Sequence, residues 1–311
     1  MFSWLPLIIL TLFSLVIHFV TTFIVLLPHT QESANSLSIA AAVAMLLLFQ
    51  LLFGLFAVSA IKTILTAPGE IPSWLRSDGK SDLHSYSNLL QCMERKRDGS
   101  PRFCRKTGAY KPDRTHFCRE VRRCVLQFQH FSTPLNSAIG FHNYKYYLLT
   151  SFYAVLCCTW VLAATLPEVI AAWPPLSAVP APSEATGASP AALALGRFHT
   201  VVVDGMLRRD TSAQWVVDAA ILATLVLAAI ALAPLTLTLV LHLCLIARGR
   251  TYHEWRAMRN GRRKPGRSIF DYGLLNNYAL TLGVYPLLWC VPSRTGVDGN
   301  GIFYPEQERV Q

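Results

Sequence analysis

Long runs of apolar residues dominate the chain and predict four membrane-spanning helices. A helix needs roughly 20 apolar residues to cross a bilayer core of about 30 Å. Pro167, directly after the third run, indicates the end of that helix, and Pro234 predicts a kink inside the fourth. The pattern predicts an all-α integral membrane protein, and we find no internal sequence repeat. The four runs cover Leu5–Leu27 and about Leu37–Ile61, Tyr146–Leu166 and Trp215–Ala247.

Most of the positive charges lie in two of the segments that connect or follow the apolar runs. Residues 62–145 hold 15 of the 28 Lys and Arg residues, and the tail after Ala247 holds 10. The segment between the third and fourth runs holds three, and the first connection holds none. Because Lys and Arg collect on the cytosolic side of a membrane, we predict a cytosolic N-terminus, long loop and tail. The net charge of +10 is then explained by topology and anionic headgroups rather than by nucleic acid.

Composition agrees with a membrane protein and divides the chain into four parts. Hydrophobic residues make up 52% and charged residues 15%, whereas soluble domains carry about a quarter charged residues. Asp218 lies one turn inside the fourth run, where we expect it to face water. The predicted parts are residues 1–66 with two spans, 67–145 as a cytosolic loop, 146–247 with two spans and a luminal loop at 167–214, and 248–311 as a cytosolic tail.

The cytosolic loop carries a spaced set of cysteines, histidines and basic residues between residues 103 and 147. Lys111-Pro112, Arg114, His116, Cys118, Cys124 and His130 are followed by Gly140, Asn143 and Tyr144. This spacing resembles the cysteine-rich domain of the DHHC-type palmitoyltransferases, without a gap. The resemblance implies transfer of a fatty acyl group from acyl-CoA to protein cysteines, in the endoplasmic reticulum or Golgi membrane.

Four further segments resemble the same family, in the same order along the chain. Residues 67–69 follow the second span, where the family has Asp-Pro-Gly, and residues 251–254 follow the fourth, where it has Thr-Thr-x-Glu. The tail stretch around Asn277 and the segment 297–305 resemble its C-terminal motifs. The resemblance therefore implies the lipid bilayer and acyl-CoA as partners, together with other palmitoyltransferases or substrate proteins, and no nucleic acid.

The residues that would perform the family's reaction have changed. The family's Asp-His-His-Cys tetrad falls on Gln129, His130, Phe131 and Ser132, so only the catalytic histidine position keeps its side chain. An alcohol ionises far less readily than a thiol, and an amide cannot orient a histidine as a carboxylate does. We therefore expect impaired acyl transfer at Ser132, His130 and Gln129. The alternative is a non-catalytic scaffold or regulator of active acyltransferases.

The resemblance also implies two zinc sites, which the sequence does not preserve. The first site's four positions hold Cys104, Thr107, Phe117 and Cys124, and the second site's hold Cys118, Val121, Phe131 and Ala138. A structural zinc needs about four ligands, so we expect no bound zinc and an apolar packing of the replaced positions. A rearranged single site of Cys104, Cys118, Cys124 and His116 stays open as an alternative.

Five other residues have either an acyl-CoA-binding or a structural role under the resemblance. Lys111 and Arg114 could meet acyl-CoA phosphates or stabilise the loop. Thr251 and Glu254 belong to the segment that packs against the cysteine-rich loop, so we expect Glu254 to pair with that loop. Asn277 is expected to satisfy backbone groups near the membrane, where an unpaired group is costly.

Overall fold

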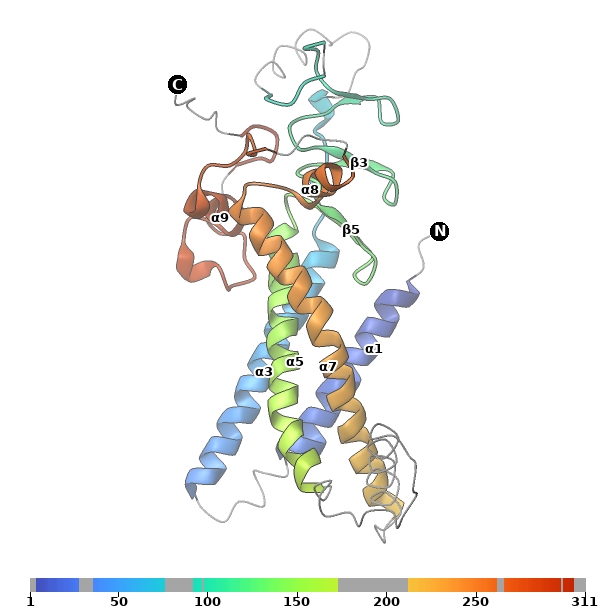
Figure 1. Ribbon diagram of the computed structural model, residues 1–311, viewed down its shortest axis with the longest axis vertical. Coiled ribbons are helices and arrows are strands. Elements are labelled where there is room, and N and C mark those ends of the chain that lie inside the picture. Colours follow the sequence, from blue (N-terminus) through green and yellow to red (C-terminus); the bar gives the residue numbers. More distant parts are fainter. Residues whose placement is uncertain are drawn as a thin grey trace, which may run out of the picture. The chain divides into compact units, whose positions relative to one another are not determined.

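The computed structural model describes residues 4–27, 36–75, 92–96, 98–172, 212–261, 266–297 and 299–304. Most of the predicted luminal loop lies outside these residues. Four helices within them are long and apolar enough to cross a membrane: Leu5–Leu26, Ile39–Leu65, Tyr144–Pro167 and Val216–Ala247. The predicted class, an all-α membrane protein with four spans, is therefore confirmed (Figure 1).

The long helices differ from the predictions at their ends. The first consists of α1 (Leu5–Phe19), which continues as a π-helical segment, η1 (Val20–Leu26). The second is α3 (Ser36–Leu65), the third α5 (Tyr144–Ala172) and the fourth α7 (Ser212–Ala247). Pro167 lies inside α5, so our prediction that this proline ends the helix was wrong. Asp218 of α7 is buried, so our prediction that this residue faces water was also wrong.

The chain forms two compact units, and each long helix contributes residues to both. One unit, which we call the head unit, contains residues 1–10, 54–153 and 236–311; the other contains residues 11–53 and 154–235. Within the second unit Leu26, Phe49, Val161 and Ala228 form an apolar core. His18 Nε2 lies 2.8 Å from Gln50 Oε1 in this unit, and Gln50 Nε2 donates to the Thr22 hydroxyl at 2.8 Å.

Three two-stranded antiparallel hairpins make up the middle of the head unit. They pair β1 (Phe103–Cys104) with β2 (Ala109–Tyr110), β3 (His116–Cys118) with β4 (Arg123–Val125), and β5 (His130–Ser132) with β6 (Ser137–Ile139). Their registers repeat every 14 residues, because Cys104 faces Ala109, Cys118 faces Arg123 and Ser132 faces Ser137. The loop therefore contains an internal repeat, which our sequence analysis missed.

Each hairpin turns through one residue with positive φ at the corresponding position. These residues are Gly108 with φ of 60°, Arg122 with 53° and Asn136 with 47°. Only Gly adopts such a conformation without steric cost, whereas Asn tolerates it and Arg rarely adopts it. The same turn geometry is thus kept with three different residue types, which indicates that packing of the hairpins determines the turns.

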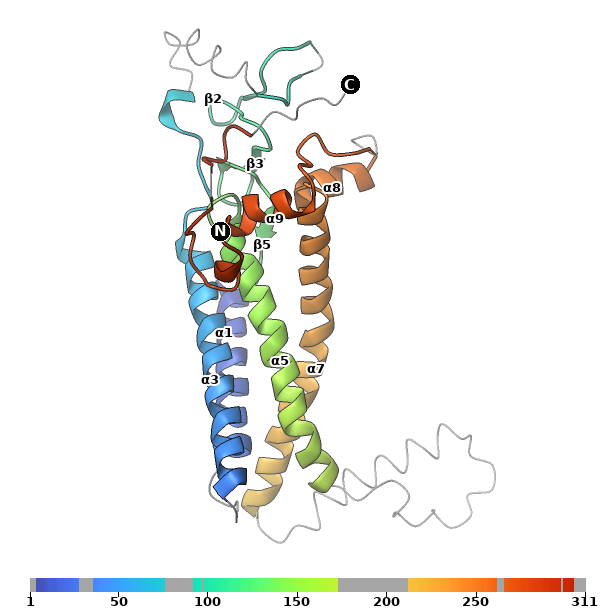
Figure 2. The same cartoon turned by 90° about the vertical axis from the view of Figure 1, so that its left-hand side faces the viewer.

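The tail after α7 completes the head unit (Figure 2). A short turn leads from α7 into α8 (Tyr252–Arg259), and α9 (Leu274–Leu282) is followed by a 3₁₀ turn, η4 (Pro286–Leu288). A second 3₁₀ turn, η2 (Ser73–Leu75), follows α3. An apolar core joins Leu135 and Ile139 of the third hairpin to Tyr147 of α5, Ile246 of α7 and Leu282 of α9. The tail is therefore packed onto the hairpins and onto the head-unit ends of these two long helices.

Candidate functional site

Arg114 and Glu254 connect the cysteine-rich loop to the segment after α7. The Arg114 guanidinium donates to the two Glu254 carboxylate oxygens at 2.9 and 3.2 Å, and to the Gly249 carbonyl at 3.0 Å. It also lies over the rings of Phe270 and Tyr304, at 4.7 and 5.6 Å from their centroids. Both charged side chains are buried. The expected pairing of Glu254 with the loop is therefore present, and the Arg114 guanidinium is used structurally.

Thr251 begins α8 with a capping box that holds Glu254 in place. The Thr251 hydroxyl accepts the Glu254 backbone N–H at 3.2 Å, and the Glu254 carboxylate accepts the Thr251 N–H at 3.0 Å. This reciprocal arrangement satisfies two free N–H groups of the helix start. One carboxylate thus caps α8 and neutralises Arg114 at the same time.

Gln129 lies directly before His130 and is hydrogen-bonded away from it. Its side-chain oxygen accepts the backbone N–H of Tyr252 at 2.9 Å, and the residue is buried. The backbone N–H of Gln129 donates to the Ile139 carbonyl at 2.9 Å. The amide therefore ties the third hairpin to the first turn of α8.

His130 lies in a cage of aromatic rings between the third hairpin, α5 and α7. Its ring centroid is 5.2 Å from that of Tyr147, 5.3 Å from His242 and 5.1 Å from Tyr252. Its Nδ1 atom is buried and has no hydrogen-bond partner among the residues that the structure describes. Burial lowers the pKa of His130 from 6.5 to about 4, so the imidazole is neutral at pH 7.

His242 on α7 is a neighbour of His130 that our sequence analysis did not single out. It is buried, and its Nδ1 atom lies 3.0 Å from the Tyr144 hydroxyl. A histidine inside a span is rare and is a functional candidate by default. That rule was the signal that could have identified His242 from the sequence.

Ser132 occupies the end of β5, two residues from His130. It is only 5% exposed and faces Ser137 across the hairpin. Residues at i and i+2 of a strand point to the same face, so Ser132 and His130 lie on one side of β5. The structure therefore keeps the two catalytic positions of the resemblance adjacent, with the hydroxyl-bearing residue buried.

The four positions of the implied first zinc site lie together in the apolar core of the first two hairpins. Cys104 and Cys124 belong to this core, Phe117 packs against it and faces Cys124 across β3–β4, and Thr107 Oγ1 lies 3.5 Å from the Cys124 sulfur. Burial raises the pKa of the Cys124 thiol to about 11. Burial acts on Cys104 in the same sense, but hydrogen bonds with Thr107 and Cys124 lower the pKa of its thiol to about 7. Lys111 is half-buried, and its positive charge acts against burial by lowering the pKa of the Cys124 thiol.

The four positions of the implied second site also lie together, and they form an apolar cluster. Cys118 and Ala138 are buried in it, and Val121 and Phe131 pack against them. Within the described residues no group of three or more His, Cys, Asp or Glu side chains could hold a metal ion. The structure thus does not bring Cys104, Cys118, Cys124 and His116 into the rearranged single site. Two thiols in one cluster and one in the other do not fit the four-ligand zinc centres of the family.

Two buried asparagines pin backbone segments at the head-unit ends of the long helices. Asn277 donates to the Ala247 carbonyl at the end of α7 at 3.1 Å and accepts the Tyr272 N–H at 2.9 Å, as expected. Asn143 donates to the carbonyls of Thr63 and Ala138 at 3.1 and 2.9 Å and accepts the Gly140 N–H at 2.9 Å. Asn143 was noted only as a motif match, without a role.

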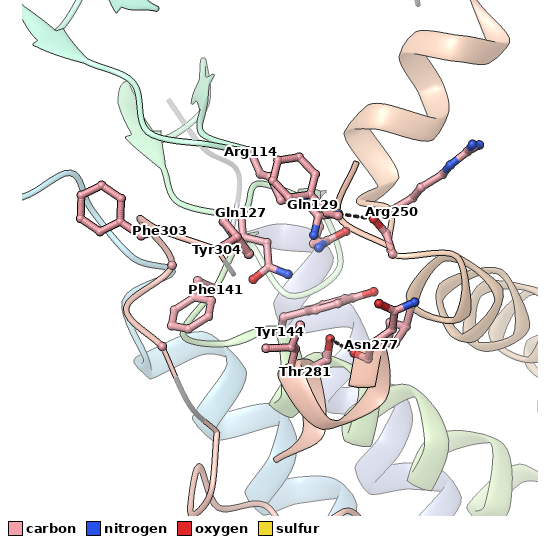
Figure 3. A pocket seen from close by; sticks show the side chains of 16 residues that line it. Arg114, Gln127, Gln129, Phe141, Tyr144, Arg250, Asn277, Thr281, Phe303 and Tyr304 are labelled. Atoms are coloured by element: carbon pink, nitrogen blue, oxygen red, sulfur yellow. Dashed lines mark hydrogen bonds between the residues drawn. The ribbon is translucent and has the colours of Figure 1, made fainter. Parts of the chain in front are cut away.

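Two pockets border these residues within the head unit. One of about 380 Å³ lies between the loop, the end of α7 and α9; Gln127, Gln129 and Tyr144 line it together with Phe141 and Tyr304 (Figure 3). The other, of about 390 Å³, is a mixed polar and apolar groove beside His130, and Arg119 and Arg256 also line it. Gln129 lines both pockets.

Comparison with known proteins identifies the family to which this chain is similar. A family model described as DHHC palmitoyltransferase matches residues 97–259, just over half of the chain. Palmitoyltransferase ZDHHC15A of Danio rerio is 28% identical over 279 residues, which cover 85% of this chain and 74% of that protein. Human palmitoyltransferase ZDHHC2 is 29% identical over 189 residues, and the probable protein S-acyltransferase 14 of Arabidopsis thaliana is 34% identical over 146. The alignments span about half the length of these last two, 49% and 48%. The chain belongs to the DHHC palmitoyltransferase family.

Proposed function

We propose that this family member does not perform the thioester relay of its family. In place of acyl transfer, it acts as a membrane scaffold or regulator of active palmitoyltransferases. The observation that carries the proposal is the hydrogen bond between the Gln129 amide oxygen and the Tyr252 N–H. That bond engages the group at the orienting position, and His130 Nδ1 has no partner among the described residues. A histidine whose Nδ1 atom has no hydrogen-bond partner is a poor base, because its tautomer is not fixed.

The nucleophile position supports the same proposal. Ser132 is a buried alcohol, and a serine attacks an acyl carbon only when a base and an orienting group activate it. In a well-studied triad, exchanging the orienting carboxylate for an amide lowers the rate by about 10⁴. An oxyester on Ser132 would also have a lower transfer potential than a thioester, so passing its acyl group to a protein thiol would be uphill.

The protein retains two pockets that can bind a ligand without acyl transfer. The pocket beside Gln127 and Tyr144 is rich in aromatic side chains, and Arg119 and Arg256 line the groove next to His130. We propose that these features serve acyl-CoA or a protein partner, with the head unit on the cytosolic side of an endoplasmic reticulum or Golgi membrane. We further propose that the two hairpin clusters are stabilised by apolar packing and need no zinc.

An acylation assay with a matched repair variant tests this function. Full-length protein in lipid nanodiscs is incubated with radiolabelled palmitoyl-CoA, and the label is then challenged with neutral hydroxylamine, which cleaves thioesters. We expect no label on the natural protein. A hydroxylamine-labile label that survives Ser132→Ala would reveal a thioester on another cysteine and overturn the proposal. A resistant label that disappears in Ser132→Ala would overturn it through an oxyester on Ser132.

The repair variant Gln129→Asp/Ser132→Cys restores both lost groups in the same scaffold. We expect it to gain a hydroxylamine-labile label, whereas Ser132→Cys alone gains less because its base is still unoriented. Adding His130→Ala to the repaired protein should remove the gain. A repaired protein that is no better labelled than the natural one would show that these substitutions do not explain the loss of activity.

A further inference from the structure

The segment from Leu274 to Val291 presents an unusual number of exposed apolar side chains. Leu287 is 94% exposed and Leu275 is 74% exposed, and Leu274, Tyr285 and Val291 are also exposed. The segment includes α9 and η4 and belongs entirely to the head unit. Several large apolar side chains exposed within one short segment of a folded protein indicate a contact with something other than water.

Two hydrogen bonds attach this segment to helices that span the membrane, and a third attaches the residue directly after it. Lys145 of α5 donates from Nζ to the Leu288 carbonyl at 2.9 Å, and Lys62 of α3 donates from Nζ to the Pro292 carbonyl at 2.7 Å. The Tyr153 hydroxyl of α5 donates to the Cys290 carbonyl. The donors lie within the stretches 39–65 and 144–167, which are long and apolar enough to span. The segment therefore lies directly beside two spans.

The positions of these donors indicate the depth of the segment. A lysine near the end of a span normally extends its ammonium group to the lipid headgroups, but Lys62 and Lys145 meet tail carbonyls instead. Tyr153 lies eight residues beyond Lys145, about 12 Å further along α5 at 1.5 Å per residue. A segment that bonds to both residues runs beside α5 from its first turn towards its third. That stretch corresponds to the headgroup region and the outer part of the hydrocarbon core.

The segment is held rigidly in a conformation that suits this position. Trp289 donates from its indole N–H to the Gly283 carbonyl at 2.7 Å, and its ring stacks on Tyr278 at 5.9 Å between centroids. Tyr and Trp are enriched at membrane–water interfaces, where an apolar ring and a polar tip are both satisfied. Leu287 lies within the 3₁₀ turn between Tyr285 and Trp289, so the most exposed apolar side chain is flanked by two interfacial aromatic residues.

We infer that residues 274–291 form a membrane-embedded anchor whose partner is the lipid bilayer, with Leu287 and Leu275 in contact with acyl chains. The anchor also carries one wall of the pocket of about 380 Å³, because Asn277, Leu280 and Thr281 of α9 line that pocket. Lipid contact on Leu274 and Leu275 thereby supports the helix that closes the pocket. This contact is independent of whether the chain transfers acyl groups.

Site-directed spin labelling of the full chain in phospholipid nanodiscs tests the anchor. The background protein has Cys157, Cys158, Cys244 and Cys290 exchanged for serine, and a labelled sample of this background corrects for the buried cysteines. Nitroxides are placed at Leu287→Cys and Leu275→Cys. The lipid reference is Leu237→Cys, which is 70% exposed on α7, and the water reference is Asn260→Cys, exposed at the end of α8. Power saturation then compares collisions with oxygen, which enriches in lipid, and with a water-soluble nickel chelate.

The oxygen-to-nickel accessibility ratio decides the outcome. At Leu287 and Leu275 we expect a ratio close to that at Leu237 and several-fold above that at Asn260. A ratio equal to that at Asn260 would place the segment in water and overturn the inference. Low accessibility to both reagents, with spin–spin broadening, would mean that a second copy covers the surface, and it would overturn the inference as well. Both labelled positions are highly exposed, so the substitutions leave the packing of the head unit unchanged.

Discussion

Arg114 and Glu254 lie 140 residues apart in sequence and meet in a buried bidentate ion pair, at 2.9 and 3.2 Å. The pair joins the turn before the second hairpin to the first turn of α8. Because Glu254 also caps α8 through Thr251, the loop and the tail are held by one carboxylate. Removing it would leave a guanidinium buried without a charge partner, which is far less favourable than an intact pair.

We therefore predict that Glu254→Ala lowers the free energy of unfolding by about 3–5 kcal/mol. The matched control is Glu70→Ala, which breaks the exposed pair of Glu70 and Arg123. That substitution should change the free energy of unfolding by about 0–1 kcal/mol, because water screens an exposed pair. Thermal melts of both variants in the same detergent provide the comparison. Equal shifts in Tm would contradict a structural role for the buried pair.

Asn143 provides a second test, because it is a fully buried amide that bonds to three backbone groups. Asn143→Asp keeps the volume but turns its two donated hydrogen bonds into repulsion between oxygen atoms. Leaving two buried carbonyls unpaired should cost about 2 kcal/mol or more. Asn276→Asp is the control, since Asn276 is exposed on α9 and makes one such bond, to the Tyr272 carbonyl. A Tm equal to that of the control would show that Asn143 is dispensable.

Burial of His130 makes the stability of the protein sensitive to acid. Its pKa falls from 6.5 to about 4 on folding because burial disfavours the charged ring. Between these values the unfolded chain binds a proton that the folded protein excludes. The stability that depends on neutral His130 is therefore fully present above about pH 6.5 and is lost as the pH falls towards 4. The loss from this group approaches about 3 kcal/mol at the lower end.

His130→Phe isolates this contribution, because it keeps an aromatic ring in the cage and removes the titrating group. We predict that Tm falls less between pH 7.5 and 4.5 in this variant than in the natural protein. Burial also lowers the pKa of His253 and His142, so both proteins retain a smaller slope of the same sign. Parallel melting curves across this pH range would mean that His130 is accessible to protons in the folded state.

The sequence was sufficient for the spans, because crossing a bilayer requires about 20 consecutive apolar residues and such a run is visible in any window. The end of α5 was misplaced because a proline removes one hydrogen bond, which a transmembrane helix can tolerate when neighbouring groups compensate. Strands of two or three residues leave no alternating pattern to detect. The 14-residue repeat therefore became visible only when Cys104, Cys118 and Ser132 were seen at equivalent turns.

Contacts in the site could be predicted where the family resemblance indicated which segments meet. Contacts that depend on how distant segments pack could not be predicted. The resemblance indicated that Glu254 contacts the loop, and Arg114 is its partner in the structure. No pattern indicated that the Gln129 amide oxygen would accept the Tyr252 N–H, because a side chain has several rotamers and its partner lies on a distant segment. His242 required knowledge of which face of α7 meets His130, and an apolar run does not contain that information.

Two apolar clusters of the hairpins, one around Cys104 and Cys124 and one around Cys118, lie at the positions of the family's zinc sites. Cys104 and Cys124 share one cluster with Thr107 and Phe117, at the four positions of the family's first site. A structural zinc needs four ligands in tetrahedral array, and its binding energy adds directly to folding stability. We predict that the natural protein holds well under one zinc per chain and that a chelator does not change its Tm. The variant Thr107→Cys/Phe117→His completes a set of three cysteines and one histidine, so it should bind about one zinc per chain. It should also melt at a higher temperature, and the chelator should abolish that gain.

Val121→Cys is the matched control, because it adds one thiol to the cluster around Cys118 and leaves that site two ligands short. Zinc is measured by atomic absorption on protein purified without chelator. Two zinc ions on the natural chain would show that the apolar clusters do not replace the metal, whereas a repaired variant without zinc would show that the hairpins no longer converge on a tetrahedral site.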